Sequence, residues 1–389
     1  MTSAREGTDS GVGTGDRARR GTPGQRFGGI DRSRGSGAYA SVGRPFGSRP
    51  AAFAALVAGL AAGVVILGLL SVSIGSVRIP VGEVWSIIGS HLGIAGAPSD
   101  PVADQIVWTV RMPRTLLAIL VGAALSVAGA VIQAVVRNPL GDPQLIGVTP
   151  GAGFGAVLVI VLGSDAVGGA SLALAAFAGA FFAFGVVFLL GRRGGEWPPA
   201  RLVLAGVAVG YVFSSATYFL QTLASPAQIQ RALYWSLGSV SGAQWHDLPL
   251  LAVVVTGGVG WLVAVGARLN ALVSGADLAR SLGVDVGRFQ LLLMALAALV
   301  TGTAVAVSGG IGFVGLMVPH IVRQLVGADH RRVLPCSVLL GAIVLLAADL
   351  VARLALAPAE LPLGIVTAGI GAPFFVWLLA GGRVGRGRR

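Results

Sequence analysis

Long uncharged stretches follow one another along the chain and set its predicted architecture. The first lies between Arg49 and Arg78 and contains 28 residues without a charge. Five more, each of 20 to 29 residues, lie between Arg114 and Arg137, Asp142 and Asp165, Asp165 and Arg192, Arg201 and Arg231, and Asp247 and Arg268. A helix of about 20 residues crosses the hydrocarbon core of a bilayer. The pattern therefore predicts six membrane spans in this part of the chain.

The C-terminal part is less regular. The 34 uncharged residues between Arg288 and Arg323 are too many for one ordinary span, and they contain the turn signal Ser308-Gly309-Gly310. We interpret this stretch as two short spans joined by a tight turn. Two further spans are expected at about 333–352 and 361–379. The sequence thus predicts an all-α polytopic membrane protein with ten transmembrane helices.

Both ends of the chain differ from this apolar part. Residues 1–50 are rich in Gly, Ser, Thr and Arg and contain almost no apolar residues, so we expect a disordered cytoplasmic tail there. The ten-span domain covers residues 51–381, and residues 382–389 form a short basic cytoplasmic tail.

The composition excludes an ordinary soluble domain. Of the 389 residues, 54% are hydrophobic and only 11% are charged, whereas soluble proteins carry about 25% charged residues. The single cysteine, Cys336, excludes an intramolecular disulfide, and one Cys with four His excludes a typical structural zinc cluster. We expect neither a metal nor a cofactor to be bound by this chain.

The basic residues, all 28 of them Arg, indicate the orientation. With the N-terminus inside, ten spans place 23 arginines on the cytoplasmic side, as the positive-inside rule requires. The arginines placed outside are Arg78, Arg111, Arg114, Arg231 and Arg353. We therefore expect a multi-pass protein of the cytoplasmic membrane with both termini inside. The net charge of +12 lies mostly in the two tails, so nucleic acid is not an expected partner.

Ionisable residues are scarce inside the predicted spans. Asp349 and Arg353 lie one helical turn apart, which indicates a local ion pair. A proton- or sodium-driven carrier would be expected to show more buried charge. Because the chain has no Lys, it lacks a Gly-x-x-x-x-Gly-Lys-Ser/Thr phosphate loop. If transport is active, the ATPase must be another chain.

A weak internal repeat appears at an offset of 180 residues. Its two copies would be separated by five spans, so they would lie in opposite orientations, as in many transporters. The matched pairs are Gly122 and Gly302, Gly129 and Gly309, Pro139 and Pro319, and Gly147 and Gly327.

A short helix is expected in the cytoplasmic connection between Arg268 and Arg288. Ser274 and Asp277 have capping-box spacing, and Gly283 is a suitable C-terminal stop. Leu278 and Leu282 give this helix an apolar face. Composition alone favours a loop helix that packs on its own protein, and the alternative is a knob that docks into a partner.

Several long motifs resemble the permease family that imports ferric siderophores, haem and cobalamin. They follow the family's order over about residues 51–381. The motifs are Arg111-Met-Pro-Arg114-Thr, Gln133 through Arg137-Asn-Pro-Leu140-Gly-Asp-Pro, Leu278-Ala-Arg-Ser-Leu-Gly-Val, Ile311-Gly-Phe-Val-Gly-Leu-Met-Val-Pro-His320-Ile-Val-Arg, Gly327-Ala-Asp-His-Arg331, Ala348-Asp-Leu-Val-Ala-Arg353 and Glu360-Leu-Pro-Leu-Gly.

The resemblance implies the membrane subunit of a type II ATP-binding-cassette importer in the bacterial inner membrane. Its partners would be a second copy of itself or a homologous permease, two ATPase subunits that use ATP, and a periplasmic or lipid-anchored binding protein. The subunit would perform no catalysis. A ferric siderophore is the expected cargo, and haem and cobalamin are the alternatives.

The resemblance also assigns roles to particular residues. The ATPase coupling helix would comprise Ser274, Gly275, Asp277, Leu278, Ala279, Arg280, Ser281, Leu282 and Gly283. The arginines that receive acidic residues of the binding protein match Arg111, Arg114 and Arg353. The cytoplasmic gate matches Asn138 and Leu140, and a second gate segment aligns near Pro199 and Ala200.

Two other classes of protein remain as alternatives. An ion-coupled secondary carrier would work without an ATPase and would need intramembrane ionisable residues. A structural or channel-like membrane protein would not need a partner-docking cytoplasmic helix.

Overall fold

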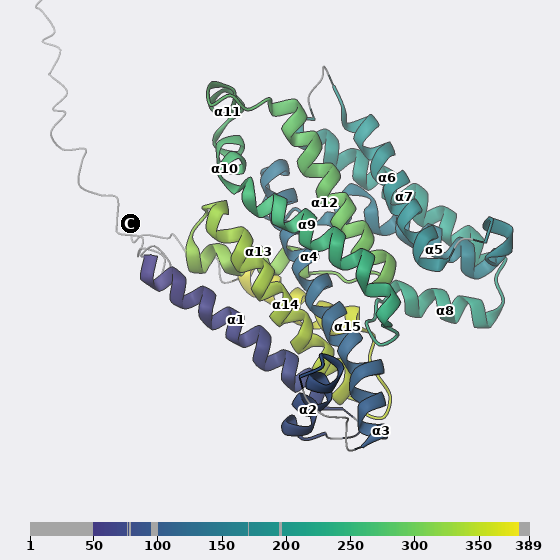
Figure 1. Cartoon of the computed structure of the whole chain (residues 1–389). Coiled ribbons are helices and arrows are strands. Elements are labelled where there is room, and N and C mark those ends of the chain that lie inside the picture. The colour runs from purple at the N-terminus through teal and green to yellow at the C-terminus, as the bar shows by residue number, and fades with distance from the viewer. Residues whose placement is uncertain are drawn as a thin grey trace, which may run out of the picture. The chain divides into compact units, whose positions relative to one another are not determined.

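The computed structural model describes residues 50–75, 77, 79–94, 100–169, 171–193 and 197–380, and these form a series of helices (Figure 1). The first half contains α1 (Pro50–Ser73), α2 (Val81–His91), α3 (Pro101–Asp104), η3 (Gln105–Arg111), α4 (Met112–Val136), η4 (Pro143–Ile146), α5 (Val148–Leu162), η5 (Asp165–Val167), α6 (Leu172–Gly191) and α7 (Pro199–Thr222). The second half contains α8 (Pro226–Ser236), η6 (Trp245–Asp247), α9 (Leu248–Ala264), α10 (Gly266–Ser274), α11 (Ala276–Ser281), α12 (Val286–Ser308), α13 (Val314–Val326), α14 (His330–Leu354) and α15 (Leu363–Ala380).

The predicted spans all coincide with helices. Within the described residues, seven helical segments are long and apolar enough to cross a membrane, and α5, α13 and α15 are shorter apolar helices. The protein is therefore an all-helical, multi-pass membrane protein, whereas the count of ten spans stays a prediction. The turn expected inside the 288–323 stretch is confirmed, because α12 ends at Ser308 and α13 begins at Val314. Residues 1–49, 381–389 and Arg78 lie outside the described residues, so the two tails and the placing of Arg78 also stay predictions.

Helix α4 is the central helix of the fold, and nearly all of its residues are buried. It contacts α14, α12, α13 and α9. Glycines permit the closest of these approaches: a Cβ atom added to Gly122 would lie 2.3 Å from the carbonyl oxygen of Gly341 in α14, and one added to Gly129 would lie 1.9 Å from that of Gly315. Small residues allow helix backbones to approach in this way in membranes. Cys336, on α14, is buried.

A second packing centre joins α5 to α6, with α7 and α8 beside them (Figure 1). A Cβ atom added to Gly151 or Gly155 of α5 would lie 2.4 Å and 2.0 Å from the carbonyl oxygens of Gly179 and Ala175 of α6. This small-residue pair therefore serves helix packing. Gly59 of α1, by contrast, has no neighbouring atom that an added Cβ would meet within 4 Å.

The four pairs of the predicted internal repeat divide into two groups. Gly122 and Gly302 both lie inside helices, and Gly147 and Gly327 both have a positive φ. Gly129 lies inside α4, whereas Gly309 follows the end of α12, and Pro139 lies in the turn after α4, whereas Pro319 lies inside α13. The inverted repeat therefore stays a prediction.

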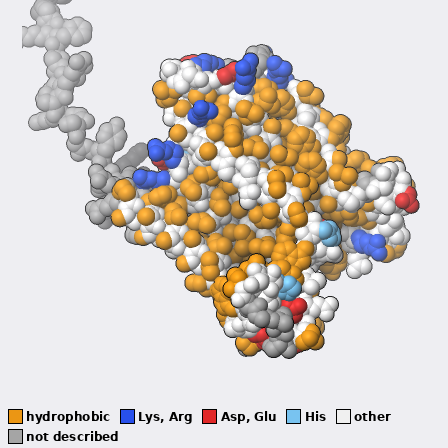
Figure 2. Space-filling view, in the orientation of Figure 1, with side chains coloured by type: hydrophobic (Ala, Val, Ile, Leu, Met, Phe, Trp, Pro, Cys, Tyr) orange, Lys and Arg blue, Asp and Glu red, His pale blue; other side chains and the backbone are white. Residues whose placement is uncertain are grey.

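The two ends of the helical part carry different small elements. Helices α2 and α3 lie at one end and α10 and α11 at the opposite end (Figure 1). Figure 2 shows hydrophobic side chains over most of the face between these ends, and arginine side chains gathered mainly toward the α10–α11 end. This distribution fits a membrane-embedded band with a basic end.

Candidate docking and coupling sites

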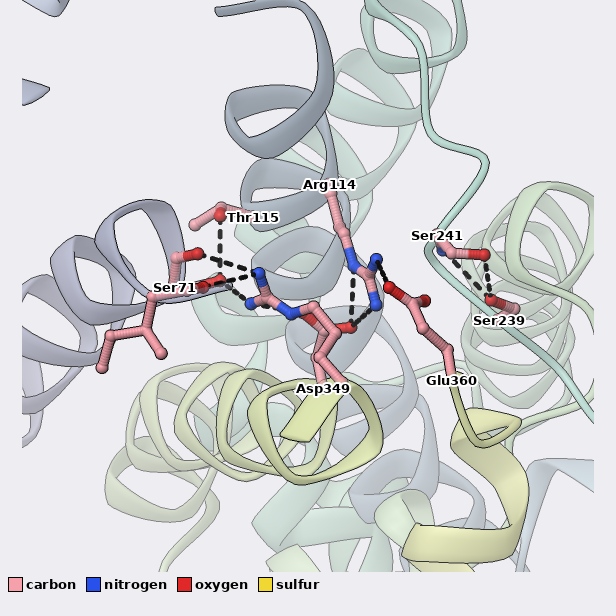
Figure 3. A network of polar contacts seen from close by, with 9 residues as sticks. Ser71, Arg114, Thr115, Ser239, Ser241, Asp349 and Glu360 are labelled. Atoms are coloured by element: carbon pink, nitrogen blue, oxygen red, sulfur yellow. Dashed lines mark hydrogen bonds and ion pairs between the residues drawn. The ribbon is translucent and has the colours of Figure 1, made fainter. Parts of the chain in front are cut away.

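Arg114 of α4 binds two carboxylates that come from distant parts of the sequence (Figure 3). Its Nε and Nη2 atoms donate hydrogen bonds to Oδ1 of Asp349 in α14, at 3.0 and 2.8 Å. Its Nη1 atom donates to Oε1 of Glu360, in the connection between α14 and α15, at 2.9 Å. Charge-assisted bonds of this kind are the strong ones, so Arg114 links α4 firmly to α14 and to the following connection.

Arg353 joins the same carboxylate to α1. Its Nη2 atom lies 2.9 Å from Oδ2 of Asp349, which confirms the ion pair predicted one helical turn apart. Nη2 also donates to Oγ of Ser71 at 2.7 Å, and Nη1 donates to the Ser71 carbonyl at 3.0 Å. The hydroxyls of Ser71 and Thr115 are hydrogen-bonded at 3.0 Å. The end of α1 is thus tied to both α14 and α4.

Arg111 ends η3, a π-helical segment that continues directly into α4. Its guanidinium donates to the carbonyl oxygens of Val72 and Ser73 at 2.7 and 2.9 Å, and also to that of Val77. These contacts cap the end of α1, where carbonyl groups have no partner within the helix.

The three predicted docking arginines therefore lie together, as the arginine cluster (Arg111, Arg114, Arg353), but they do not project from the surface. They are 6%, 6% and 9% exposed. They line a pocket of about 240 Å³, whose walls also include Gly75, Val77, Ile106, Val110, Pro358 and Glu360. A docking partner would have to insert its side chains into this pocket to reach the arginines. The docking role of the three arginines stays a prediction.

The predicted coupling helix consists of two helices separated by Gly275. Helix α10 ends at Ser274, and α11 begins at Ala276 after Gly275, which has a φ of +141°. Leu278 and Leu282 are 48% and 65% exposed, so within the described residues this apolar face is only partly covered by the protein. The docking role of this element stays a prediction.

Of the two caps predicted for this helix, the N-terminal one is wrong and the C-terminal one is confirmed. The capping box between Ser274 and Asp277 is wrong, because the Ser274 hydroxyl donates back to the Asn270 carbonyl at 3.0 Å and Gly275 is the N-cap residue. The stop at Gly283 is confirmed: its φ is +77°, its N–H donates to the Arg280 carbonyl, and the Val284 N–H donates to the Ala279 carbonyl. That pair of bonds is a Schellman motif. Asp277 and Arg280 form an exposed ion pair at 2.9 Å.

Asn270 of α10 connects this element to the turn before α14. Its Nδ2 atom donates to Oδ1 of Asp329 at 2.6 Å, and its Oδ1 atom accepts from the His330 backbone N–H at 2.9 Å and lies 2.8 Å from the His330 ring nitrogen Nδ1. Partial burial favours a higher pKa for Asp329, but the Asn270 bond, the Arg331 N–H and the charges of Arg331 and Arg332 together lower it. Nothing in the sequence marks Asn270 as a functional residue, because a lone polar residue in a short helix forms no recognisable pattern.

The predicted gate residues form a tight exposed turn after α4. Arg137 ends that helix in the left-handed conformation, with a φ of +53°. The Asn138 side chain accepts from the Leu140 N–H at 2.9 Å, and Leu140 is 47% exposed. The Arg137 guanidinium donates to the Leu272 carbonyl of α10 at 3.3 Å. The turn is therefore in contact with the coupling element, and its gating role stays a prediction.

Gln133 makes a second link near this turn. Its Nε2 atom donates to the carbonyls of Gly315 and Leu316 in α13 at 3.2 and 3.3 Å, and its Oε1 atom accepts from Arg323. Pro199 and Ala200, the predicted second gate segment, begin α7. Their gating role stays a prediction.

A cavity of about 720 Å³ forms a groove between α5, α7 and α8. Thr149, Pro150, Gly206, Gly210, Tyr211 and Trp235 are among its lining residues. Tyr211 and Tyr218, which also line it, are 73% and 66% exposed. Gly206 and Gly210 have no side chains to fill the groove, so they leave space at its wall.

This fold, with paired charges toward one end and a short exposed helix at the other, defines a polytopic membrane transport subunit. The sequence profile of the FecCD transport family matches residues 63–381. The cobalamin import system permease protein BtuC of Halobacterium salinarum is 47% identical over 277 residues, which cover 71% of this chain and 74% of that protein. The vitamin B12 import system permease protein BtuC of Salmonella paratyphi A is 40% identical over 298 residues, covering 77% and 88%.

A solved structure supports the same conclusion. It shows a metal-chelate type ABC transporter in an inward-facing conformation, is 34% identical, and covers 84% of this chain and 99% of its own with a TM-score of 0.74. The chain belongs to the FecCD transport family. It is thus an ABC importer permease of the FecCD/BtuC type, and ABC permeases of this type work with ATPase and binding-protein partners.

Proposed function

We propose that this chain is the membrane subunit of an ATP-driven importer that carries cobalamin across the cytoplasmic membrane. The observation that carries this proposal is the 40–47% identity to two permeases named for cobalamin or vitamin B12 import. The ferric siderophore expected from the sequence has no such support among these named relatives. It remains the second candidate because the 34% identical solved structure is of a metal-chelate type transporter.

The partners follow from the two ends of the fold. At the α2–α3 end, a substrate-binding protein inserts acidic side chains toward the arginine cluster, and the paired charges set orientation and encounter rate. At the α10–α11 end, the exposed face of Leu278 and Leu282 docks into one ATPase subunit. Two copies of the chain, or this chain and a homologous permease, bind two ATPases, which use ATP while this chain binds no cofactor and performs no catalysis.

The cargo path is proposed to follow the groove between α5, α7 and α8. Tyr211 and Tyr218 are exposed beside this groove, and we propose that a second copy of the chain covers this face. A groove shared by two copies would enclose a larger path than either copy has alone. ATP-driven movement of α10 and α11 reaches the Asn138–Leu140 turn through the Arg137–Leu272 contact.

Uptake by whole cells tests this function. Cells with and without this chain would be offered labelled cobalamin, ferric siderophore and haem separately, and a plasmid copy would restore the chain. Loss of cobalamin uptake alone, restored by the plasmid, supports the proposal. Loss of ferric siderophore uptake alone keeps the importer and replaces the cargo. Unchanged uptake of all three in a strain without related permeases would contradict both candidates.

A further inference from the structure

The two carboxylates bound to Arg114 differ sharply in their surroundings. The side chain of Asp349 is 1% exposed and is shared by Arg114 and Arg353. The side chain of Glu360 is 40% exposed, and it forms an ion pair with Arg114. Asp349 is therefore a fixed part of the helix packing, whereas Glu360 is held by a part-buried contact at the wall of the pocket.

The charged side chains around the pocket carry a net charge of +1, and an exchange of one carboxylate for another keeps this balance. Arg111, Arg114 and Arg353 carry three positive charges, and Asp349 and Glu360 carry two negative ones. If Glu360 moves away, the pocket loses a carboxylate at Arg114 Nη1, and a carboxylate from outside restores the same charge and the same hydrogen bond. Such an exchange leaves no buried arginine without its partner, which would otherwise be costly.

We propose that Glu360 is a resident carboxylate that an acidic side chain of the binding protein displaces from Arg114 on docking. The inference rests on the proposed function in requiring a binding protein at this end. Glu360 occupies the position that the incoming carboxylate needs, so it weakens docking and rejects partners whose acidic residues are absent or misplaced. Specificity of this kind depends on competition between carboxylates as well as on attraction between opposite charges.

Glu360 also connects the pocket to the groove. Its side chain is one wall of the arginine pocket and of a neighbouring cavity lined by Trp235, Ser239 and Ser241 (Figure 3 shows both serines near Glu360). Trp235 in turn lines the groove between α5, α7 and α8. Release of Glu360 thus changes the wall next to Trp235 when the binding protein arrives.

The backbone around Glu360 supports this connection. The N–H groups of Leu363 and Gly364 donate to the carbonyls of Gly238 and Leu237, each at 2.9 Å. The connection that carries Glu360 is therefore hydrogen-bonded to the segment that follows α8. A displacement of Glu360 acts on a segment already joined to the mouth of the groove.

The test compares the affinity of the binding protein for the wild type and for two Glu360 variants. The permease–ATPase complex in nanodiscs would be titrated with the cobalamin-loaded binding protein of the same transport system. Glu360→Gln removes the competing charge, so the Kd should fall about two- to fivefold, the range of a partly exposed ion pair. Glu360→Asp, whose shorter carboxylate does not reach Arg114 in the same way, should change the Kd in the same direction. An unchanged or higher Kd in both variants overturns the proposal.

Two further variants separate this inference from the proposed function. Glu83→Gln removes a carboxylate from the first turn of α2, at the same end of the fold, and should leave the Kd unchanged. If it tightens binding equally, the effect is one of net charge and the displacement proposal fails. Arg114→Glu should abolish binding. If Arg114→Glu and the wild type bind alike, docking at the arginine cluster is itself wrong, whereas loss of binding with no gain in Glu360→Gln rejects only the role of Glu360.

Discussion

The two ends of the helical part differ in the kind of surface that they offer to a partner. At the α2–α3 end the arginines are buried, already paired and arranged around a pocket. At the α10–α11 end two leucines project from a short helix, and its ion pair between Asp277 and Arg280 lies in the open. The first end can recognise a partner only by exchanging bonds that exist, and the second can do so by burying surface that is now exposed.

This difference decides which substitutions damage the protein and which damage only its contacts. A charge inside the arginine cluster holds α1, α4 and α14 together before any partner arrives. Leu278 and Leu282, at the other end, are only partly covered by the described residues of this chain. Stability and partner binding should therefore respond separately at the two ends.

The largest effect is expected from Asp349→Asn. The change leaves Arg114 and Arg353 without their shared buried charge, and breaking a buried pair from one side costs about 3–5 kcal/mol of stability. Thermal unfolding in detergent measures it. Asp277→Asn is the matched control because it removes a carboxylate from an exposed ion pair. Equal melting temperatures for the two variants would contradict the contrast between the ends.

Next in size is the double substitution of Leu278 and Leu282 by Asp. Burial of a leucine contributes about 1.5–3 kcal/mol, so the complex with the ATPase should weaken at least about tenfold. The unfolding temperature of the permease alone should hardly change, since both side chains are exposed. Co-purification with the ATPase at graded concentrations gives the affinity. A stable variant that retains its ATPase would exclude these leucines from the contact.

Asn270→Ala should have an intermediate effect. It removes the bonds to Asp329 and His330, and unsatisfied buried groups cost about 1–3 kcal/mol. Because α10 then loses its link to the turn before α14, ATP hydrolysis should continue while transport falls. The ratio of transported cargo to hydrolysed ATP in proteoliposomes reports this. Asn270→Asp places a second carboxylate against Asp329, so it should lower the ratio at least as much as Asn270→Ala, and an unchanged ratio in both variants would rule out the link.

The smallest effect concerns pH. The pKa of Asp329 is lowered in the folded protein, so its contribution to stability is complete above its unfolded pKa of about 3.9 and is lost as the pH falls through the lower folded value. Between about pH 5 and pH 3 the wild type should therefore lose slightly more stability than Asp329→Asn. The melting temperatures of the two proteins, measured side by side across this range, should converge at low pH. A constant difference between them would refute the assignment.

Much of the helical layout could be predicted because burial in lipid forbids charge along a span. The uncharged stretches that begin after Arg49, end before Arg137 and end before Arg268 each contain a helix. The break after Ser308 followed from the glycines next to it. The pairing of Asp349 with Arg353 followed from their spacing. These features depend on neighbours in the sequence, which is why sequence alone was sufficient.

What could not be predicted depends on residues far apart in the sequence. Arg114 meets Glu360 across 246 positions, and nothing in either motif indicates their contact. Ser274 had the spacing of a cap, but its hydroxyl could also bond to Asn270 within α10, and only the position of Gly275 decided between them. The cargo could not be predicted for another reason: the residues that matched the family concern docking, coupling and gating, and none of them is among the residues that line the groove.

One continuous helical segment, Pro101–Val136, runs from the arginine cluster to the turn that contains Asn138 and Leu140. Its 36 residues span about 50 Å at about 1.5 Å per residue. As a rigid rod, this segment would connect the arginine pocket, toward one end, with the predicted gate at the other end. A tilt of about 3° around its middle moves each tip by about 1.3 Å, which is the size of the helix shifts that switch packed interfaces.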